Sequence, residues 1–99
     1  MEKVTEKWLE AQLRRGVEGL GGVYLKFTVP NVNGVPDRLI LFPVGLVYFA
    51  EIKTPGEKLR PLQEKRKNQL EGMGFKVYIV KSLKDVENFI KEIKHAKEV

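Results

Sequence analysis

The sequence predicts an α/β domain with the element order helix, three strands, helix, strand, helix. Apolar residues recur at helical spacing near both ends of the chain. Four short runs rich in β-branched and aromatic residues lie between these ends, bounded by glycine and proline. With a length of 99 residues, the chain 1–99 is expected to form one domain with one core.

The first helix is expected from about Thr5 to Leu20. Its apolar stripe consists of residues three or four positions apart, and Gly21-Gly22 ends the pattern; the stripe is Leu9, Leu13, Val17 and Leu20. The first strand is expected over residues 23–29, where β-forming residues dominate.

A β-hairpin is predicted next, because two β-rich runs, 39–42 and 46–50, flank the turn-forming segment Pro43-Val44-Gly45. A loop over residues 54–60 contains Pro55-Gly56 and leads to a second helix. Pro61 suits the first position of that helix, which is expected to end near Met73 with Gly74 as its stop.

The last strand is expected over residues 75–80, and a closing helix follows it. Ser82 and Asp85 form a plausible capping pair at the start of that helix. Its buried stripe is expected to contain Val86, Phe89, Ile90 and Ile93.

Three charged residues of the hairpin are predicted to meet at one point. Asp37 and Glu51 lie equally far from Val44 in the sequence, so a hairpin without a bulge makes them cross-strand neighbours, with β-carbons about 5 Å apart. Lys53 shares their face, because side chains alternate along a strand. By itself, Pro36-Asp37 would indicate a turn, and Glu51-Ile52-Lys53 would indicate a solvent-exposed charge pair along a strand. Together, in register on one hairpin, the two motifs predict an active site.

A divalent cation is the expected partner of the two acids. Opposed like charges destabilise a sheet, and strands that are apolar on both faces predict that the pair is partly buried. Mg²⁺ is bound by one or two carboxylates, waters and substrate phosphate oxygens. Lys53 could hydrogen-bond a water at such a site or stabilise the charge that builds up on a phosphate.

Glu6 is a candidate third acid. At about 100° per residue, Glu6 lies about 25° from the centre of the first helix's apolar stripe, whereas Glu10 lies about 65° away. Glu6 is therefore expected to point inward. Its charge could simply favour the helix dipole, or it could reach the carboxylate pair as a further ligand, directly or through water; Glu10, one turn later, is the other choice for this acid.

Composition limits the possible chemistry and favours a polyanionic partner. The net charge is +5, which suits DNA or RNA, although a merely soluble basic protein would also fit. The absence of cysteine excludes disulfides and thiolate sites, and allows an intracellular location. His95 is the only histidine, so His-based zinc sites and Ser-His catalysis are excluded. No signal peptide or membrane span is apparent, which predicts a soluble protein.

The central motifs resemble those of the VRR-NUC (virus-type replication-repair nuclease) family, within the restriction-endonuclease-like PD-(D/E)XK superfamily. The resemblance covers nearly the whole chain and rests on Gly34-Val35-Pro36-Asp37, Phe49-Ala50-Glu51-Ile52-Lys53, a Pro-Gly loop and Pro61-Leu62-Gln63. It implies an αβββαβ core with a central mixed β-sheet flanked by helices and a closing C-terminal helix.

The resemblance also implies metal-dependent hydrolysis of phosphodiester bonds. Asp37, Glu51 and the main-chain carbonyl of Ile52 would hold Mg²⁺ or Mn²⁺, with Glu6 contributing from the first helix. Lys53 would position or activate the attacking water, and Gln63 would help to orient that group. The family pattern implies a homodimer that cuts branched DNA, above all Holliday junctions, without an organic cofactor, in the cytoplasm of a bacterium or of a phage-infected host.

Basic residues around this site are the predicted contacts with DNA. The start of the second helix, close in sequence to Lys53, could offer free amides and basic side chains to a phosphate backbone, although any single lysine there could equally be solvated. The candidates are Lys26, Lys58, Arg60, Lys65 and Arg66.

Two other functions fit the same residues. The nuclease could act on flaps, splayed arms or ordinary duplex, because phosphate contacts carry no base information. Alternatively, the chain could be a nucleic-acid-binding module in which the acids only form a buried ion pair with Lys53.

Overall fold

The computed structural model describes residues 4–97 and confirms the predicted order of the elements. In this range the helices and strands are α1 (Glu6–Gly19), β1 (Val23–Lys26), β2 (Arg38–Phe42), β3 (Leu46–Ile52), α2 (Pro61–Gly72), β4 (Lys76–Val80) and α3 (Leu83–Lys97). Thr5 caps α1 by accepting a hydrogen bond from the Trp8 amide, and the predicted Ser82–Asp85 cap of α3 is present at 3.1 Å.

The four strands form one mixed sheet in the order β1-β2-β3-β4. β1, β2 and β3 are antiparallel neighbours, whereas β4 is parallel to β3. A parallel pair needs a crossover connection, and α2 supplies it between β3 and β4. The mixed sheet and its flanking helices agree with the predicted fold class.

The β2–β3 hairpin closes without a bulge. Arg38 faces Ala50 at one end of the pairing, and Phe42 faces Leu46 at the other. The chain reverses through a short 3-10 segment, Pro43–Gly45, in which Val44 has φ 61°. This register is the one that the symmetric spacing about Val44 predicts.

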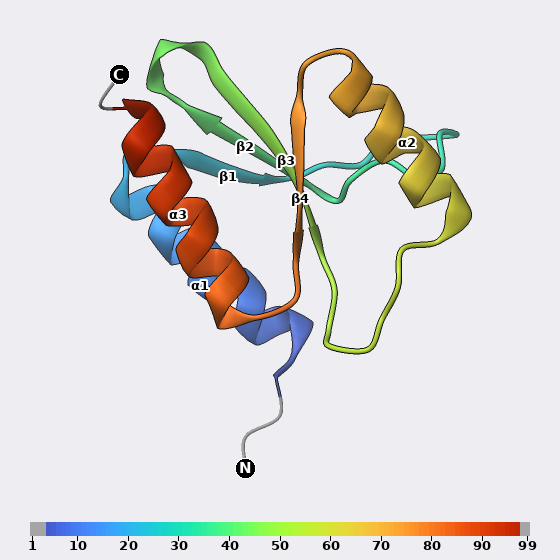
Figure 1. Cartoon of the computed structure of the whole chain (residues 1–99), viewed down its shortest axis with the longest axis horizontal. Helices are drawn as coiled ribbons and strands as arrows, with labels where there is room; N and C mark the ends of the chain where they lie inside the picture. Colours follow the sequence, from blue (N-terminus) through green and yellow to red (C-terminus); the bar gives the residue numbers. More distant parts are fainter. Residues whose placement is uncertain (1–3, 98–99) are drawn as a thin grey trace.

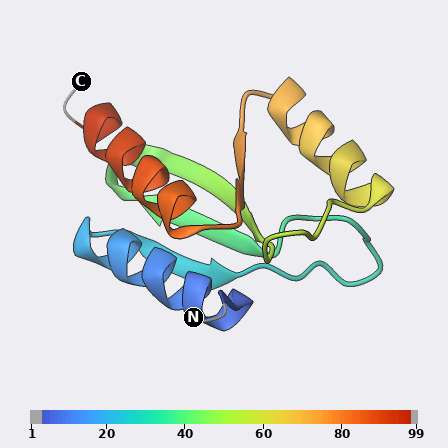
Figure 2. The same cartoon turned by 60° about the horizontal axis from the view of Figure 1, so that its bottom comes forward.

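Helices α1 and α3 cover one face of the sheet, and α2 lies on the other side of β4 (Figure 1, Figure 2). The core lies beneath α1 and α3, where even-numbered strand residues such as Ile40, Ala50 and Ile52 pack against Leu13 and Phe89. The opposite face is covered less completely, and α2 itself contributes no buried residue. The two faces of the sheet therefore differ in how well they are shielded from water.

The first strand is shorter than predicted, ending at Lys26 rather than Val29. Its partner β2 begins only at Arg38, and the last bond between the two segments is from the Phe27 amide to the Asp37 carbonyl at 2.9 Å. Beyond Phe27 the chain has no strand to pair with, so its β propensity does not produce a ladder. Within residues 4–97, no helix is both long and apolar enough to cross a membrane.

Candidate active site

The structure brings Asp37 and Glu51 together at the end of the β2–β3 hairpin. One step beyond the Arg38–Ala50 pair, the Asp37 amide donates a 2.9 Å hydrogen bond to Glu51 Oε2. This bond crosses between the strands where the hairpin register places the two residues opposite each other. The central geometric prediction is confirmed.

Glu51 and Lys53 are buried on the face of the sheet that α1 and α3 do not cover. Along β3 they alternate with Ala50 and Ile52, which belong to the core on the other face. Only 5% of Glu51 and 8% of Lys53 is exposed. The Lys53 amide donates to the Val80 carbonyl at 2.9 Å, so the β3–β4 pairing holds the backbone at this position.

Gln63 joins the site from the first turn of α2. Its side-chain amide donates to Glu51 Oε1 at 2.7 Å, while its own carbonyl oxygen accepts from the Arg60 amide at 2.8 Å. The second bond caps the helix, because the Arg60 amide has no partner within the helix. The predicted site residue Gln63 is therefore fixed at both ends of its amide group.

Gly34 allows the loop before Asp37 to pack against the start of α2. Its φ is +83°, which favours glycine. A β-carbon added at Gly34 would lie only 2.4 Å from the Leu62 carbonyl oxygen. Because Leu62 directly precedes Gln63, this close approach sets the distance between α2 and Glu51.

The Asp37 carboxyl group has one engaged and one unengaged oxygen. Oδ2 lies 3.5 Å from the Arg38 guanidinium. Oδ1 is buried and has no hydrogen-bond partner in the described chain. A buried oxygen without a partner is costly, so Oδ1 marks a place where a ligand atom would be stabilising.

Both hairpin acids hold their protons more tightly than usual. Burial is the largest cause and raises the pKa of Asp37, opposed by the neighbouring Arg38 charge. Burial also raises the pKa of Glu51, and the Asp37 charge adds to this, while the Asp37 amide and Lys53 act in the opposite direction. Desolvation and a like-charged neighbour both disfavour the ionised form.

Glu6 lies near the site but does not point inward as predicted. It is exposed in the first turn of α1, before Leu9, the first buried residue of the helix. Partial burial raises the pKa of Glu6, and the charges of Glu57 and Asp37 add to this effect. The reason is that the core does not extend to the first turn of α1. Glu10, the alternative acid, instead forms a 3.0 Å ion pair with Arg38.

Glu57 is an acid near the site that the sequence reasoning did not single out. It accepts a 2.6 Å hydrogen bond from the Thr54 amide and another from the Thr54 hydroxyl. These bonds lower the pKa of Glu57 and fold the start of the loop that follows Lys53. The sequence signal that points to Glu57 is the turn-forming Pro55-Gly56, which an acid follows directly.

The residues at the hairpin end suit a hard divalent cation. Within residues 4–97, no three Asp, Glu or His side chains are gathered as a metal-binding group. An ion here would therefore take Asp37 and Glu51 as its side-chain ligands, with remaining positions for main-chain, water or substrate oxygens. The unpartnered Asp37 Oδ1 and the raised pKa values of both acids fit this, because a nearby cation stabilises ionised carboxylates.

The predicted DNA contacts are spread around the site. Lys58 lines a hollow of about 600 Å³ together with Ile79, the cross-strand neighbour of Glu51. Arg60 lines another of about 600 Å³ together with Gln63. Lys65 and Arg66 line a third, of about 350 Å³, farther along α2. Lys26 is exposed at the end of β1, opposite Arg38.

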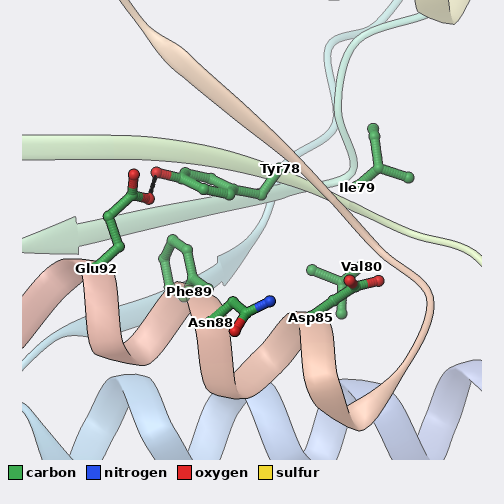
Figure 3. Close-up of a pocket in the computed structure, with 7 residues that line it drawn as sticks. All are labelled: Tyr78, Ile79, Val80, Asp85, Asn88, Phe89 and Glu92. Atoms are coloured by element: carbon green, nitrogen blue, oxygen red, sulfur yellow. Dashed lines mark hydrogen bonds between the residues drawn. The ribbon is translucent and has the colours of Figure 1, made fainter.

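A separate hollow between β4 and α3 has a different character (Figure 3). It measures about 310 Å³, and Tyr78, Asp85 and Glu92 are among its lining residues. Tyr78 donates a hydrogen bond to Glu92, and Asp85 accepts one from the Lys81 amide. Tyr78 packs against the α1–α3 core, so this hollow lies on the other side of the sheet from Glu51.

Known proteins match this chain over most of its length, among them one curated relative and one solved structure. A protein of Acyrthosiphon pisum secondary endosymbiont phage 1, named "Putative nuclease p44", is 38% identical over 82 residues, covering 83% of this chain and 88% of that protein. A solved structure described as "VRR_NUC domain" superposes with a TM-score of 0.82 at 29% identity, covering 87% of this chain and 94% of the other. No protein-family model matches the chain.

Proposed function

The chain belongs to the VRR-NUC family of nuclease domains, and from that premise we propose that it is a divalent-metal-dependent endonuclease that cuts branched DNA as a homodimer. The observation that carries the chemical part of this proposal is the juxtaposition of half-buried Asp37 with buried Glu51, which shares its side of the sheet with Lys53 and accepts a hydrogen bond from Gln63. Burying charged groups such as Glu51 and Lys53 lowers stability unless they are paired, and charged groups in such surroundings are common at functional sites.

Asp37, Glu51 and the main-chain carbonyl of Ile52 are the proposed ligands for Mg²⁺ or Mn²⁺, and Glu6, which is exposed on α1, is proposed to contribute through a water. When bound, the ion supplies a Lewis acid that polarises a phosphate oxygen and lowers the pKa of water. Asp37 Oδ1 is suited to be a ligand because it has no hydrogen-bond partner among residues 4–97. Glu51 is held in place from two sides, by the Asp37 amide and by Gln63.

Lys53 is proposed to orient the attacking water and to stabilise the negative charge that develops on the phosphate. Its ammonium group is carried on a largely buried side chain, where electrostatic interactions are stronger than in water. Gln63 is proposed to orient the same group, because its amide is fixed between Glu51 and the start of α2.

DNA is the proposed substrate because positive charge surrounds the acids. The chain carries a net charge of +5, and Lys58 and Arg60 line two hollows beside the site. Lys65, Arg66 and Lys26 extend the proposed contact surface. Basic side chains of this kind bind phosphates without reading the base sequence.

The choice of a four-way junction and of a homodimer follows the family pattern. A two-fold dimer presents two equivalent sites to two strands of a junction. Cleavage of flaps or duplex by the same chemistry is the second candidate, and a binding module without cleavage is the third. These three functions give different products from the same substrates.

The test is cleavage of a synthetic immobile four-way junction, a flap and a linear duplex with Mg²⁺, Mn²⁺ or EDTA, with the products mapped on each strand. We expect symmetric nicks in the junction with either metal and none with EDTA. Asp37→Asn, purified in the same way, is the control for a contaminating nuclease. Equal cutting of all three substrates would overturn the junction preference, and binding without any cutting would overturn the nuclease.

A further inference from the structure

Arg38 makes a set of contacts that sequence reasoning did not anticipate. Its side chain is only 12% exposed, although it follows the active-site Asp37 directly. Nη1 donates a 2.9 Å hydrogen bond to the Asp37 main-chain carbonyl and lies 3.5 Å from Asp37 Oδ2. The guanidinium therefore contacts both the backbone and the carboxyl group of the preceding residue.

Two residues from other elements fix the Arg38 guanidinium. Nε donates to the Tyr24 hydroxyl at 2.9 Å, and Nη2 lies 3.0 Å from Glu10 Oε2. Tyr24 is buried in β1 and Glu10 is half-buried in α1, so the three groups connect the helix, the edge strand and β2. Burial raises the pKa of Tyr24 to about 12, so its hydroxyl remains protonated.

These contacts fix the direction of the Asp37 carboxyl group. The main-chain carbonyl of Asp37 accepts hydrogen bonds from Arg38 and from the Phe27 amide, and Oδ2 of its side chain lies on the Arg38 side. The other oxygen, Oδ1, is the one that has no partner in the described chain. Holding one oxygen therefore orients the other.

We propose that Arg38, braced by Glu10 and Tyr24, is a positioning residue that aims Asp37 Oδ1 at the metal ligand position. This inference rests on the proposed function, because it assigns Arg38 a role in preparing a site for a divalent cation. Arg38 does not itself touch the metal or the substrate in this assignment. Its effect passes through Asp37.

Only arginine can make this set of contacts. Its planar guanidinium presents donors in several fixed directions, and here Nε, Nη1 and Nη2 each serve a different neighbour. A lysine ammonium is a single flexible point charge that cannot reach all three neighbours at once. Arg38→Lys therefore keeps the charge and removes the orientation.

The experiment compares Arg38→Lys and Glu10→Gln with Glu18→Gln. Glu18 is a matched control because it also pairs with an arginine, Arg14, but both side chains are more than half exposed. Three quantities are measured: the Kd for Mn²⁺ by calorimetry without DNA, the Mn²⁺ concentration that gives half-maximal cleavage, and the Tm in EDTA.

We expect the Mn²⁺ Kd to rise about tenfold for Arg38→Lys, because groups that orient metal ligands typically contribute 10- to 100-fold to affinity. Glu10→Gln should raise the Kd roughly threefold, and Glu18→Gln should leave it unchanged. Saturating Mn²⁺ should restore cleavage by Arg38→Lys to near the wild-type rate. A merely structural defect would instead lower the rate at every metal concentration.

Different outcomes separate this inference from the proposed function. If the wild type binds no Mn²⁺ and cuts no DNA, the proposed function fails, and the role of Arg38 fails with it. If the wild type does both, and folded Arg38→Lys matches its Kd and metal dependence, only the positioning role is overturned. If Arg38→Lys does not fold, Glu10→Gln decides: an unchanged Kd overturns the role, and an increased one supports it.

Discussion

Near the open end of the β2–β3 hairpin, the two faces bury different kinds of side chain, although Phe49 is also buried on the face of Glu51. On the face toward α1 and α3, Ile40, Ala50 and Ile52 are at most 3% exposed and belong to the hydrophobic core. On the other face, Glu51 and Lys53 are 5% and 8% exposed. Neighbouring residues along β3 therefore differ in the free energy of burial, which is favourable for apolar side chains and unfavourable for charged ones.

This difference links one face to the stability of the fold and the other to the proposed chemistry. Burying apolar surface stabilises the fold by about 25 cal/mol per Å². Burial of the two acids instead raises the pKa of Asp37 and of Glu51, so folding works against their ionised forms. The fold keeps these charges at a cost in stability, and the proposed cation and phosphate would bind at the site that they form.

The largest expected effect separates the two faces directly. Lys53→Met keeps most of the aliphatic stem and removes the charge, so we expect the cleavage rate to fall about 10³-fold, as for loss of a strong electrostatic group. The Tm should change little. Leu13→Ala on the core face is the contrasting variant: it should cost about 3 kcal/mol of stability but leave folded molecules active.

Rates are measured on the proposed DNA substrates, and stability is measured by chemical denaturation. If Lys53→Met unfolds as readily as Leu13→Ala, the charged face is also structural. If it cuts at the wild-type rate, Lys53 has no part in the chemistry.

The next effect tests how α2 is held against the charged face, which is the face of the sheet that carries Glu51 and Lys53. Gly34→Ala places a β-carbon 2.4 Å from the Leu62 carbonyl oxygen, so α2 or the loop must move. Gly21→Ala is a matched control, because Gly21 has a similar φ of +79° but no atom within 4 Å of the added carbon. Both variants should lose about 1 kcal/mol from the unfavourable φ. Gly34→Ala should lose roughly 1–3 kcal/mol more through the clash.

Activity should separate the two glycine variants further. Displacing the first turn of α2 moves Gln63 relative to Glu51, so Gly34→Ala should cut roughly tenfold more slowly. Gly21→Ala should cut normally at temperatures where it is folded. Equal losses of stability and of rate in both variants would show that the contact between Gly34 and Leu62 has no special role.

The hairpin and its acids could be predicted from the sequence because they depend on local rules. A three-residue turn centred on Val44 fixes the register, and strand alternation then places Asp37, Glu51 and Lys53 on one face. Gln63 could be named only through the family resemblance. Its position depends on how α2 returns to the sheet, which no local pattern determines.

The remaining features required long-range information. The end of β1 at Lys26 depends on where β2 begins, twelve residues later in the chain. The contact between Gly34 and Leu62 joins a loop to the first turn of α2, and neither segment carries a sequence signal for the other. The Arg38–Glu10 pair could be predicted in part from the sequence. Strand alternation places Arg38 on the α1 side of the sheet, and Glu10 lies at the edge of the apolar stripe of α1.

The smallest expected effect concerns the energetic cost of the charged face itself. Because the folded-state pKa of Asp37 is raised, its ionisation destabilises the fold, and this loss grows as pH rises from the unfolded pKa of about 3.9 through the folded value. Asp37→Asn removes the loss. Since the Asp37 side chain is 42% exposed, solvent screening reduces the gain to about 0.5 kcal/mol, or roughly 2–4 °C in Tm, at neutral pH in EDTA.

Calorimetric scans in EDTA and in excess Mg²⁺ provide the measurement. In EDTA the advantage of Asp37→Asn should disappear below the unfolded pKa, where the wild-type carboxyl is protonated in both states. In excess Mg²⁺ the order should reverse, because only the wild type gains the stabilisation that comes from binding the ion to the folded state. A Tm for Asp37→Asn below that of the wild type in EDTA would mean that the ion pair with Arg38 outweighs burial, and that the charged face has no stability cost at this position.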